Sequence, residues 1–289
     1  MYITDDFKSN KVNISLEIFP PKPDVPMEKV LNTVDSLATT NPHFISVTYG
    51  AGGSQKGNTI EIASYIQNTK NKTAIAHLTC IGSTKQEIVA VLDELKSKNI
   101  TNILALRGDF PAHFSDEDKN KTEIKYASDL VKIIKDYGGF CIGGACYPEG
   151  HVETDNRFDD IDNLKYKIDA GVDFLISQLF FDNNMLYNFI YRMLKKNIDV
   201  PVCAGIMPVI NKKSISRMCS LSGATLTPKF RNMLDRFSDN PEALKQAGIA
   251  YATEQIIDLI SNGVNNIHLY TMNKPEIANK IIDNLKGII

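Results

Sequence analysis

Polar side chains interrupt several apolar segments of the chain, in each case close to where the segment ends. Glu17 lies within ISLEIF, His77 within IAHLT and Gln178 within LISQLFF. A carboxyl group that points inward from such a segment would be suited to proton donation. An amide among so many apolar residues needs hydrogen-bond partners, and the polar edge of a ligand could supply them. The pattern indicates a small-molecule site.

Each of these residues also has a structural explanation. Glu17 could lie on a solvent-facing edge, and a lone histidine such as His77 within a strand is more often a satisfied core residue than a catalyst. Arg107 and Asp109, which follow the segment NILAL, could form an ion pair within a turn, because Gly-Asp is common in turns. The prediction of a small-molecule site therefore depends on these polar residues taken together, and not on any one of them.

The elements that would position this set alternate between apolar, strand-like segments and amphipathic helical patterns. The strand-like segments begin about 36 residues apart on average, close to the ~31 per unit of an eightfold barrel, at Val12, His43, Thr73, Thr101, Gly139, Asp173, Val200 and Asn265. Helical patterns separate them, for example at Met27–Thr39, Lys85–Lys98, Tyr126–Tyr137, Lys212–Leu221 and Pro241–Ser261. We expect an α/β fold, a single-domain (β/α)8 TIM-type barrel over residues 1–289, with an open doubly wound sheet as the alternative.

The barrel interpretation explains why so many of these segments end in polar residues, because the carboxyl ends of barrel strands form the active site. Further polar residues at these ends are Thr48, Tyr49, Thr79, Tyr147, Glu149, His151, Asp182, Tyr270 and Asn273. Almost every strand delivers a polar group to the same end, which indicates a substrate site there.

Composition narrows the class of protein. The 289 residues include 32 basic and 34 acidic ones, and a formal net charge of −2 gives no reason to expect nucleic acid or an anionic membrane as partner. No apolar run approaches the ~20 residues of a membrane helix, so we expect a soluble cytoplasmic protein. Five cysteines are an odd number, which favours buried structural thiols in a reducing compartment.

Several common motifs are absent or incomplete. The segment GGSQKGNT at Gly52–Thr59 imitates a phosphate-binding P-loop, but Asn58 replaces the required lysine, and a flexible strand-to-helix loop is the better interpretation. No G-x-G-x-x-G follows a strand, so a dinucleotide would not be held in the Rossmann manner. No H-E-x-x-H or G-x-S-x-G is present, and no metal site is expected.

An ordered set of motifs resembles the methylenetetrahydrofolate reductase family in its compact bacterial form. The set includes LEIFPPK, VTYGAGG, ALRGD, YPEGH, SQLFFD and GIMPV, and it lies between Ile14 and Lys274. The resemblance implies a barrel that holds FAD non-covalently and reduces 5,10-methylenetetrahydrofolate to 5-methyltetrahydrofolate, in one-carbon metabolism and methionine biosynthesis. It also implies NAD(P)H as reductant in a ping-pong cycle, and bacterial relatives commonly self-associate.

The resemblance also implies roles for individual residues. Glu17 would be the general acid that opens the imidazolidine ring, and Asp109 would tune the flavin and favour the cationic iminium. Gln178 would bind the pterin, and Lys274 a folate carboxylate. The residues that would contact the flavin cofactor are Thr48, His77, Arg107, Gly108, Asp109, Tyr126, Ala127, Tyr147, His151, Asp160, Asn163 and Lys167. Because the net charge is near zero, Arg107, Lys167 and Lys274 would attract the anionic ligands locally.

Three positions depart from the family pattern. Lys212 stands where many members carry a phenylalanine, Lys274 where an arginine is common, and Tyr166 where a basic residue is common. The change at Lys212 leaves open a flavoprotein subunit that receives electrons from a partner protein. Another flavin barrel, such as a proline dehydrogenase-like oxidase, and a non-enzymatic barrel are further alternatives.

Overall fold

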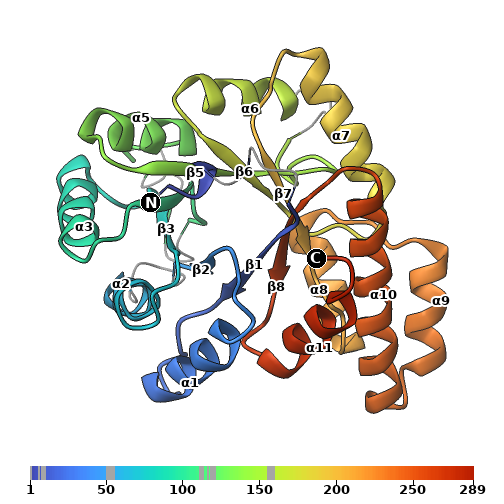
Figure 1. Cartoon of the computed structure of the whole chain (residues 1–289). Helices are drawn as coiled ribbons and strands as arrows, with labels where there is room; N and C mark the ends of the chain where they lie inside the picture. The colour runs from blue at the N-terminus through green and yellow to red at the C-terminus, as the bar shows by residue number, and fades with distance from the viewer. Residues whose placement is uncertain are drawn as a thin grey trace.

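Eight parallel strands close into a barrel in sequence order in the computed structural model (Figure 1), which describes residues 2–5, 7, 11–49, 56–110, 114–115, 117, 122–154 and 160–289. The barrel is closed because β1 (Asn13–Ile18) pairs with both β2 (Ile45–Val47) and β8 (Asn266–Tyr270). This closure confirms the TIM-type barrel and excludes the open doubly wound sheet.

The remaining strands are short and almost wholly buried, as expected for parallel strands covered by helices. They are β3 (Ala74–Thr79), β4 (Asn102–Leu106), β5 (Cys141–Cys146), β6 (Phe174–Ser177) and β7 (Val202–Ile206). Each strand lies within a segment expected from the sequence. The segment around β6 corrects one expectation: its apolar run continues to Phe181, but the strand ends at Ser177, and Leu179–Phe181 are buried in the following loop. An apolar run reports burial and cannot by itself mark where a strand stops.

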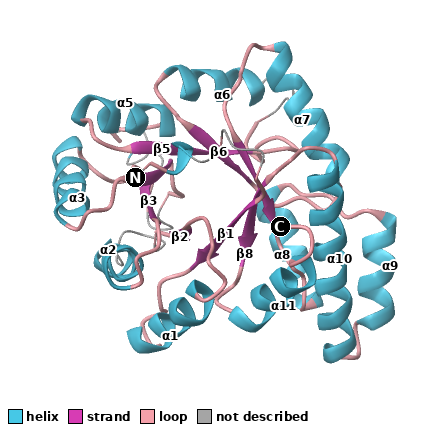
Figure 2. Cartoon of the chain, in the orientation of Figure 1, coloured by secondary structure: helices cyan, strands magenta, loops and turns pink. Residues whose placement is uncertain are grey.

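Helices form the outer ring around the barrel (Figure 2). They are α1 (Met27–Ala38), α2 (Lys56–Ser64), α3 (Lys85–Ser97), α5 (Ala127–Tyr137), α6 (Asp160–Asp169), α7 (Asn183–Lys195), α8 (Lys212–Ser222), α9 (Pro228–Phe237), α10 (Pro241–Ser261) and α11 (Pro275–Leu285). A π-helical turn, Tyr65–Thr69, continues α2. Of the P-loop-like segment, residues 56–59 begin α2, and residues 52–55 lie outside the described residues.

Helix α9 is the element that the helical patterns did not predict. Thr227 caps it by accepting a hydrogen bond from the N–H of Phe230, and Pro228 occupies the first turn. Its apolar face joins a second small core with the loop after β6, where Phe230 stacks on Phe181 with ring centroids 4.6 Å apart. The insertion between β7 and β8 therefore holds three helices where two were expected.

The amino end of the barrel is filled by apolar side chains. Phe174 is fully buried, and Gly143 makes room for it, because a Cβ there would lie 2.3 Å from the Phe174 ring. A short 3-10 helix, Ile3–Asp5, covers this end, and the N–H of Ile3 donates to Asn102 Oδ1 over 3.2 Å. Ile3 is buried in the same cluster as Phe174, so the N-terminal segment is part of the packed core.

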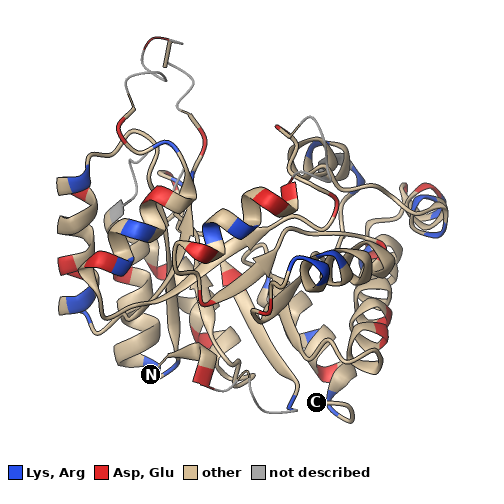
Figure 3. Ribbon diagram, turned by 90° about the horizontal axis from the view of Figure 1, so that it is seen from above, with Lys and Arg blue, Asp and Glu red and all other residues tan. Residues whose placement is uncertain are grey.

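The surface carries charges of both signs (Figure 3), and the cysteines form no disulfide bonds. Basic and acidic residues are interspersed along the outer helices (Figure 3). All five cysteines are free thiols, four buried and Cys219 half-buried, and burial raises the pKa of Cys146 to about 12. Within the part of the chain that the structure describes, no helix combines the length and apolar character that crossing a membrane requires.

Candidate active site

A cavity of about 1790 Å³ opens at the carboxyl ends of the strands. Pockets of about 300–1000 Å³ hold one drug-sized ligand, so this cavity has room for more than one. Fourteen of the fifteen candidate residues line it: Glu17, Thr48, His77, Arg107, Gly108, Asp109, Tyr126, Ala127, Tyr147, His151, Asp160, Asn163, Lys167 and Gln178. The structure thus brings together side chains separated by up to about 160 residues in the sequence.

Lys274 is the candidate residue that does not line the cavity. It is exposed immediately before α11, at the same end of the barrel. Lys212, at the start of α8, is also absent from the described cavity lining, and its Nζ lies 2.8 Å from Asp235 Oδ1 on α9. Its charge is therefore held by a neighbouring helix.

Glu17 is the most enclosed acidic residue of the site. It is only 6% exposed, which settles the choice between barrel interior and solvent-facing edge in favour of the interior. Its Oε2 lies 3.6 Å from His77 Nε2 and 3.6 Å from His268 Nε2. One carboxyl group thus faces two imidazole nitrogens at the floor of the cavity.

The hydrogen bonds of His268 assign its protons. Ser15 Oγ donates to the carbonyl of Ile267 over 3.0 Å and lies 2.8 Å from His268 Nδ1. Because the one hydroxyl proton of Ser15 is used, His268 Nδ1–H donates to Ser15 Oγ. In the neutral ring, His268 Nε2 is then an acceptor, facing both Ser46 Oγ at 3.4 Å and Glu17.

His77 differs from the satisfied core histidine that its position in a strand suggests. It is 5% exposed, and its Nε2 has no hydrogen-bond partner among the described residues. Burial lowers the pKa of His77 to about 4, although the nearby Glu17 opposes the shift. The ring is therefore neutral at pH 7, and a buried nitrogen without a partner indicates a place where a ligand completes the hydrogen bonding.

The end of β1 is held by the turn after β8. The carbonyl of Glu17 accepts a hydrogen bond from Thr271 Oγ1 over 2.6 Å, and Asn273 bonds both the N–H and the carbonyl of Phe19 over 2.8 Å. Asn273, a polar strand-end residue in the sequence, thus has a structural role. It fixes the backbone that carries Glu17.

The turn after β4 approaches β3 closely. Gly108 has φ +84°, and a Cβ at this position would lie 2.9 Å from the Cβ of Thr79. The carbonyl of Arg107 accepts hydrogen bonds from the N–H groups of Cys80 and Ile81. A residue with a side chain would strain this turn, so glycine is required for Arg107 and Asp109 to reach the cavity.

Arg107 pairs with Glu153 and not with Asp109, so the alternative of an ion pair within the turn does not apply. Its Nη1 lies 2.5 Å from Glu153 Oε2 and its Nη2 lies 2.8 Å from Glu153 Oε1. The pairing raises the pKa of Arg107 and lowers that of Glu153. Asp109 is exposed and lines the cavity.

The loop after β5 is fixed on two sides. Glu149 is buried and accepts hydrogen bonds from the N–H and the hydroxyl of Thr225, and Arg192 donates to the carbonyl of Pro148. Within the loop, His151 lies edge-on to Tyr147 with ring centroids 4.5 Å apart. Sequence spacing gave no sign of Thr225, because 76 residues separate it from Glu149.

Helices α5 and α6 complete the wall. Asp129 accepts a hydrogen bond from the N–H of Tyr126, and Tyr126, Ala127 and Ser128 line the cavity. The first turn of α5 therefore begins at the cavity, where the helix dipole favours an anion. The ammonium of Lys167 on α6 donates to the carbonyl of Ala145, and burial lowers its pKa. Arg107 and Lys167 are thus both engaged with protein partners.

Gln178 and Tyr270 form the side of the cavity beside Glu17. The amide oxygen of Gln178 accepts a hydrogen bond from the N–H of Leu179, which orients the side chain. Burial, followed by the charge of Glu17, raises the pKa of Tyr270 well above its usual value, and its hydroxyl donates to the carbonyl of Ser177. Both residues are therefore held in one orientation by the backbone.

Comparison with known proteins gives consistent results. The family model described as methylenetetrahydrofolate reductase matches residues 2–286. A 5,10-methylenetetrahydrofolate reductase of Pectobacterium carotovorum is 34% identical over 275 residues, 95% of this chain and 90% of the relative. A methylenetetrahydrofolate reductase (NADH) 1 of Arabidopsis thaliana is 35% identical over 307 residues, 100% of this chain and 51% of the relative.

Among solved structures, a protein from Clostridium thermocellum, described as binding two copies of 5-methyl-5,6,7,8-tetrahydrofolic acid, has a TM-score of 0.66. The match covers 99% of this chain and 100% of that chain at 18% identity. At this level of identity the likeness concerns the fold, and it agrees with the closed barrel.

Proposed function

Because the chain belongs to the methylenetetrahydrofolate reductase family, whose members reduce 5,10-methylenetetrahydrofolate to 5-methyltetrahydrofolate, we propose that it catalyses this reduction with bound FAD and with NAD(P)H as electron donor. The chain is thus an oxidoreductase of this family. The observation that carries the proposal is the inward-facing Glu17, with two imidazole nitrogens 3.6 Å from its carboxyl group. We also propose that residues 1–289 act as one catalytic domain.

The cavity fits FAD by size and by the chemistry of its wall. Its volume of about 1790 Å³ accommodates a dinucleotide together with a second ligand. The first turn of α5 offers N–H groups to an anion, and His77 Nε2 is a buried polar atom without a hydrogen-bond partner. Thr48, Tyr147, His151, Asp160 and Asn163 would supply further polar contacts. When bound, FAD supplies the capacity to accept and donate a hydride.

In the proposed mechanism, Glu17 donates a proton to the substrate. Protonation of an imidazolidine nitrogen by Glu17 Oε2 opens the ring and produces a cationic iminium. His268 Nε2 lies 3.6 Å from the same oxygen, and its ring is held by the contact between Nδ1 and Ser15 Oγ, so His268 would help to position the carboxyl group. General acid catalysis of this kind contributes about 10²–10⁴-fold to a rate.

Charge and hydrogen bonding would position the folate. The exposed carboxylate of Asp109 lies on the cavity wall and would favour the cationic iminium electrostatically. Gln178 would bind the pterin edge through its amide. Lys274, exposed at the mouth of the barrel, would attract a carboxylate of the glutamate tail, without the bidentate geometry of an arginine.

A second candidate concerns the electron source. Lys212 replaces the aromatic residue common in the family, and its side chain is paired with Asp235 on α9. This observation favours a chain that binds FAD and the folate but receives electrons from a partner protein.

The test uses the purified full chain without oxygen. If direct reduction occurs, NADH or NADPH bleaches the flavin absorption near ~450 nm, and methylenetetrahydrofolate restores it. If neither nucleotide bleaches the flavin but 5-methyltetrahydrofolate does, the protein-donor alternative is correct. A protein that retains no flavin, and binds none when FAD is added, contradicts both.

A further inference from the structure

The ion pair between Arg107 and Glu153 joins two loops of the cavity wall. Arg107 follows β4 and Glu153 follows β5, and both line the cavity. The two guanidinium N–H groups reach the two carboxylate oxygens separately, at 2.5 and 2.8 Å. This bidentate geometry is also the one in which arginine binds a phosphate. Glu153 therefore occupies the position that a phosphate would take on Arg107.

The other charges of the cavity make this position important. Among the described lining residues there are three cations, Arg107, Lys132 and Lys167, and a larger number of carboxylates, Glu17, Asp109, Glu153, Asp160 and Asp169. Lys167 already donates to the carbonyl of Ala145. Arg107 is the one guanidinium in this part of the lining, so a ligand with a diphosphate has a strong reason to bind there.

The Glu153 side chain can move away from Arg107, whereas the Arg107 side chain is held by further contacts. The Glu153 side chain is 57% exposed and can move into water without leaving a buried polar group unsatisfied. The Arg107 side chain is 25% exposed, its Nε donates to the carbonyl of Gly108, and its guanidinium lies 5.9 Å from the ring centre of Phe110. The N–H of Glu153 donates to His151 Nδ1, and this backbone bond does not depend on the position of the Glu153 side chain.

We propose that Glu153 is a stand-in for a phosphate group of the cofactor: it occupies Arg107 in the free protein and is displaced when the diphosphate of FAD binds. The inference rests on the proposed function, since it takes FAD as the ligand. Before FAD binds, Glu153 thereby keeps the Arg107 side chain oriented and its charge neutralised. Because FAD must displace Glu153, the affinity for FAD is lower than it would be without this residue. It is a positioning residue and takes no part in the reaction.

The stand-in role and a structural role predict opposite effects of the same substitution. If Glu153 competes with the phosphate, Glu153→Gln removes the competitor and FAD binds more tightly. If Glu153 instead holds the loops in the binding conformation, the same change weakens FAD binding. A partly exposed ion pair corresponds to a change of about two- to fivefold in the dissociation constant.

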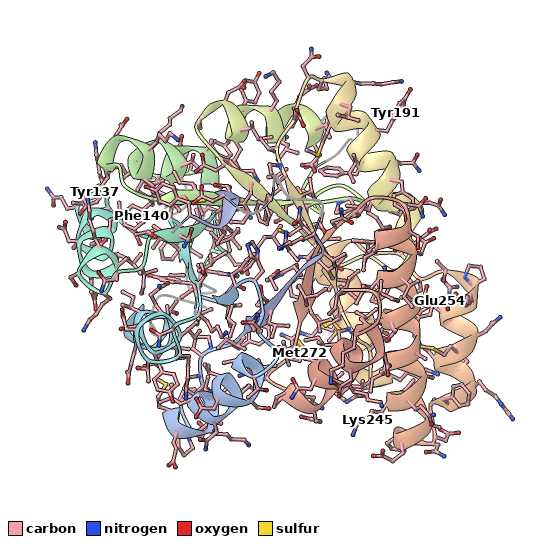
Figure 4. The ribbon with its side chains drawn as sticks, viewed as in Figure 1. Tyr137, Phe140, Tyr191, Lys245, Glu254 and Met272 are labelled. Carbon is pink, nitrogen blue, oxygen red and sulfur yellow. The ribbon has the colours of Figure 1, made fainter. Side chains whose placement is uncertain are left out.

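The experiment measures FAD binding to the flavin-free full chain by quenching of flavin fluorescence. We expect Glu153→Gln and Glu153→Ala to lower the dissociation constant about two- to fivefold relative to the unchanged protein. The matched control is Glu254→Gln, which removes a carboxylate from the exposed Lys229–Glu254 pair on α9 and α10 (Figure 4); neither residue is in the described cavity lining. The control leaves the dissociation constant unchanged.

A second readout separates the two states of the protein. The stand-in pair exists only without FAD, so Glu153→Gln lowers the Tm of the flavin-free protein and leaves the Tm of the FAD-saturated protein unchanged. Unchanged or weaker FAD binding by both Glu153 variants, or an equal loss of Tm in both states, overturns the inference. If the unchanged protein binds no FAD, the proposed function fails instead, and the two failures are thus distinguished.

Discussion

The site has two regions that are built differently, a buried centre around Glu17 and an exposed rim around Arg107 and Lys274. In the centre, Glu17 and His268 stand on paired strands, and barrel register fixes their separation. At the rim, the charged groups stand on loops and helix ends, and Arg107 is paired with the largely exposed Glu153. Strands thus fix the position of the proposed proton donor, whereas the proposed ligand-binding charges stand on loops.

The sharpest test of this comparison is Glu17→Gln. The change preserves shape and removes the proposed proton donor, so folate reduction is expected to fall by about 10²–10⁴-fold. Retained FAD and the flavin-reducing half-reaction serve as the control, measured by absorbance and stopped-flow bleaching. Folate turnover at the original rate would mean that the centre does not supply the proton.

A backbone change tests how rigid the centre is. A Cβ at Gly205 would lie 2.2 Å from the carbonyl oxygen of Ser177 and 2.8 Å from the hydroxyl of Tyr270. We expect Gly205→Ala to lower the free energy of unfolding by about 1–3 kcal/mol or more, measured by urea denaturation. Gly57→Ala is the control, since nothing lies within 4 Å of the Cβ it would add. Equal stability of the two variants would show that the barrel interior accommodates an added methyl group without loss of stability.

The pH dependence of stability tests the burial of His77. Its folded pKa, about 4, is below the unfolded value, 6.5, so the unfolded chain takes up the proton first as the pH falls. Between pH 7 and pH 5 the unchanged protein should lose about 2 kcal/mol more of its unfolding free energy than His77→Gln does. Urea denaturation at both pH values measures the difference. Parallel losses in the two proteins would contradict the assignment of a neutral, buried His77.

The smallest effects are expected at the rim. Lys212 and Asp235 are 46% and 62% exposed, and such pairs contribute little to folding. Lys212→Ala and Lys274→Ala should each change the unfolding free energy by less than about 0.5 kcal/mol. Lys274→Ala should instead raise the KM for folates with a glutamate tail, and leave kcat unchanged. A loss of kcat would mean that Lys274 acts in the chemical step, as Glu17 is proposed to do, and would contradict the distinction between centre and rim.

The sequence predicts the barrel and most of the cavity wall because both depend on a local pattern. Apolar strands with a polar residue near the end suffice to bring Glu17, His77 and Gln178 to one place once the barrel closes. His268 was not predicted, because the prediction used only polar residues near strand ends and His268 lies in the middle of the last strand. Its alternation with Tyr270 on NIHLY, which points both side chains inward, was the available signal.

The interactions that the sequence does not reveal join residues far apart in the chain. Glu149 with Thr225, and Arg107 with Glu153, form only after the loops are placed side by side. Helix α9 was a different case, because Phe230, Met233, Leu234 and Phe237 have the spacing of a helical apolar face. The apolar spacing of this helix was thus present in the sequence, although the helix was not predicted.

The packed amino end of the barrel has a consequence for the order of events in a reaction cycle. Phe44 lies against His268, with ring centroids 5.5 Å apart, and Ile3 covers the cluster from below. Molecules therefore reach Glu17 from the carboxyl end and depart in the same direction. Under the proposed direct reduction by NAD(P)H, the spent nucleotide would have to leave by this route before the folate arrives, and each reactant would inhibit the other at high concentration.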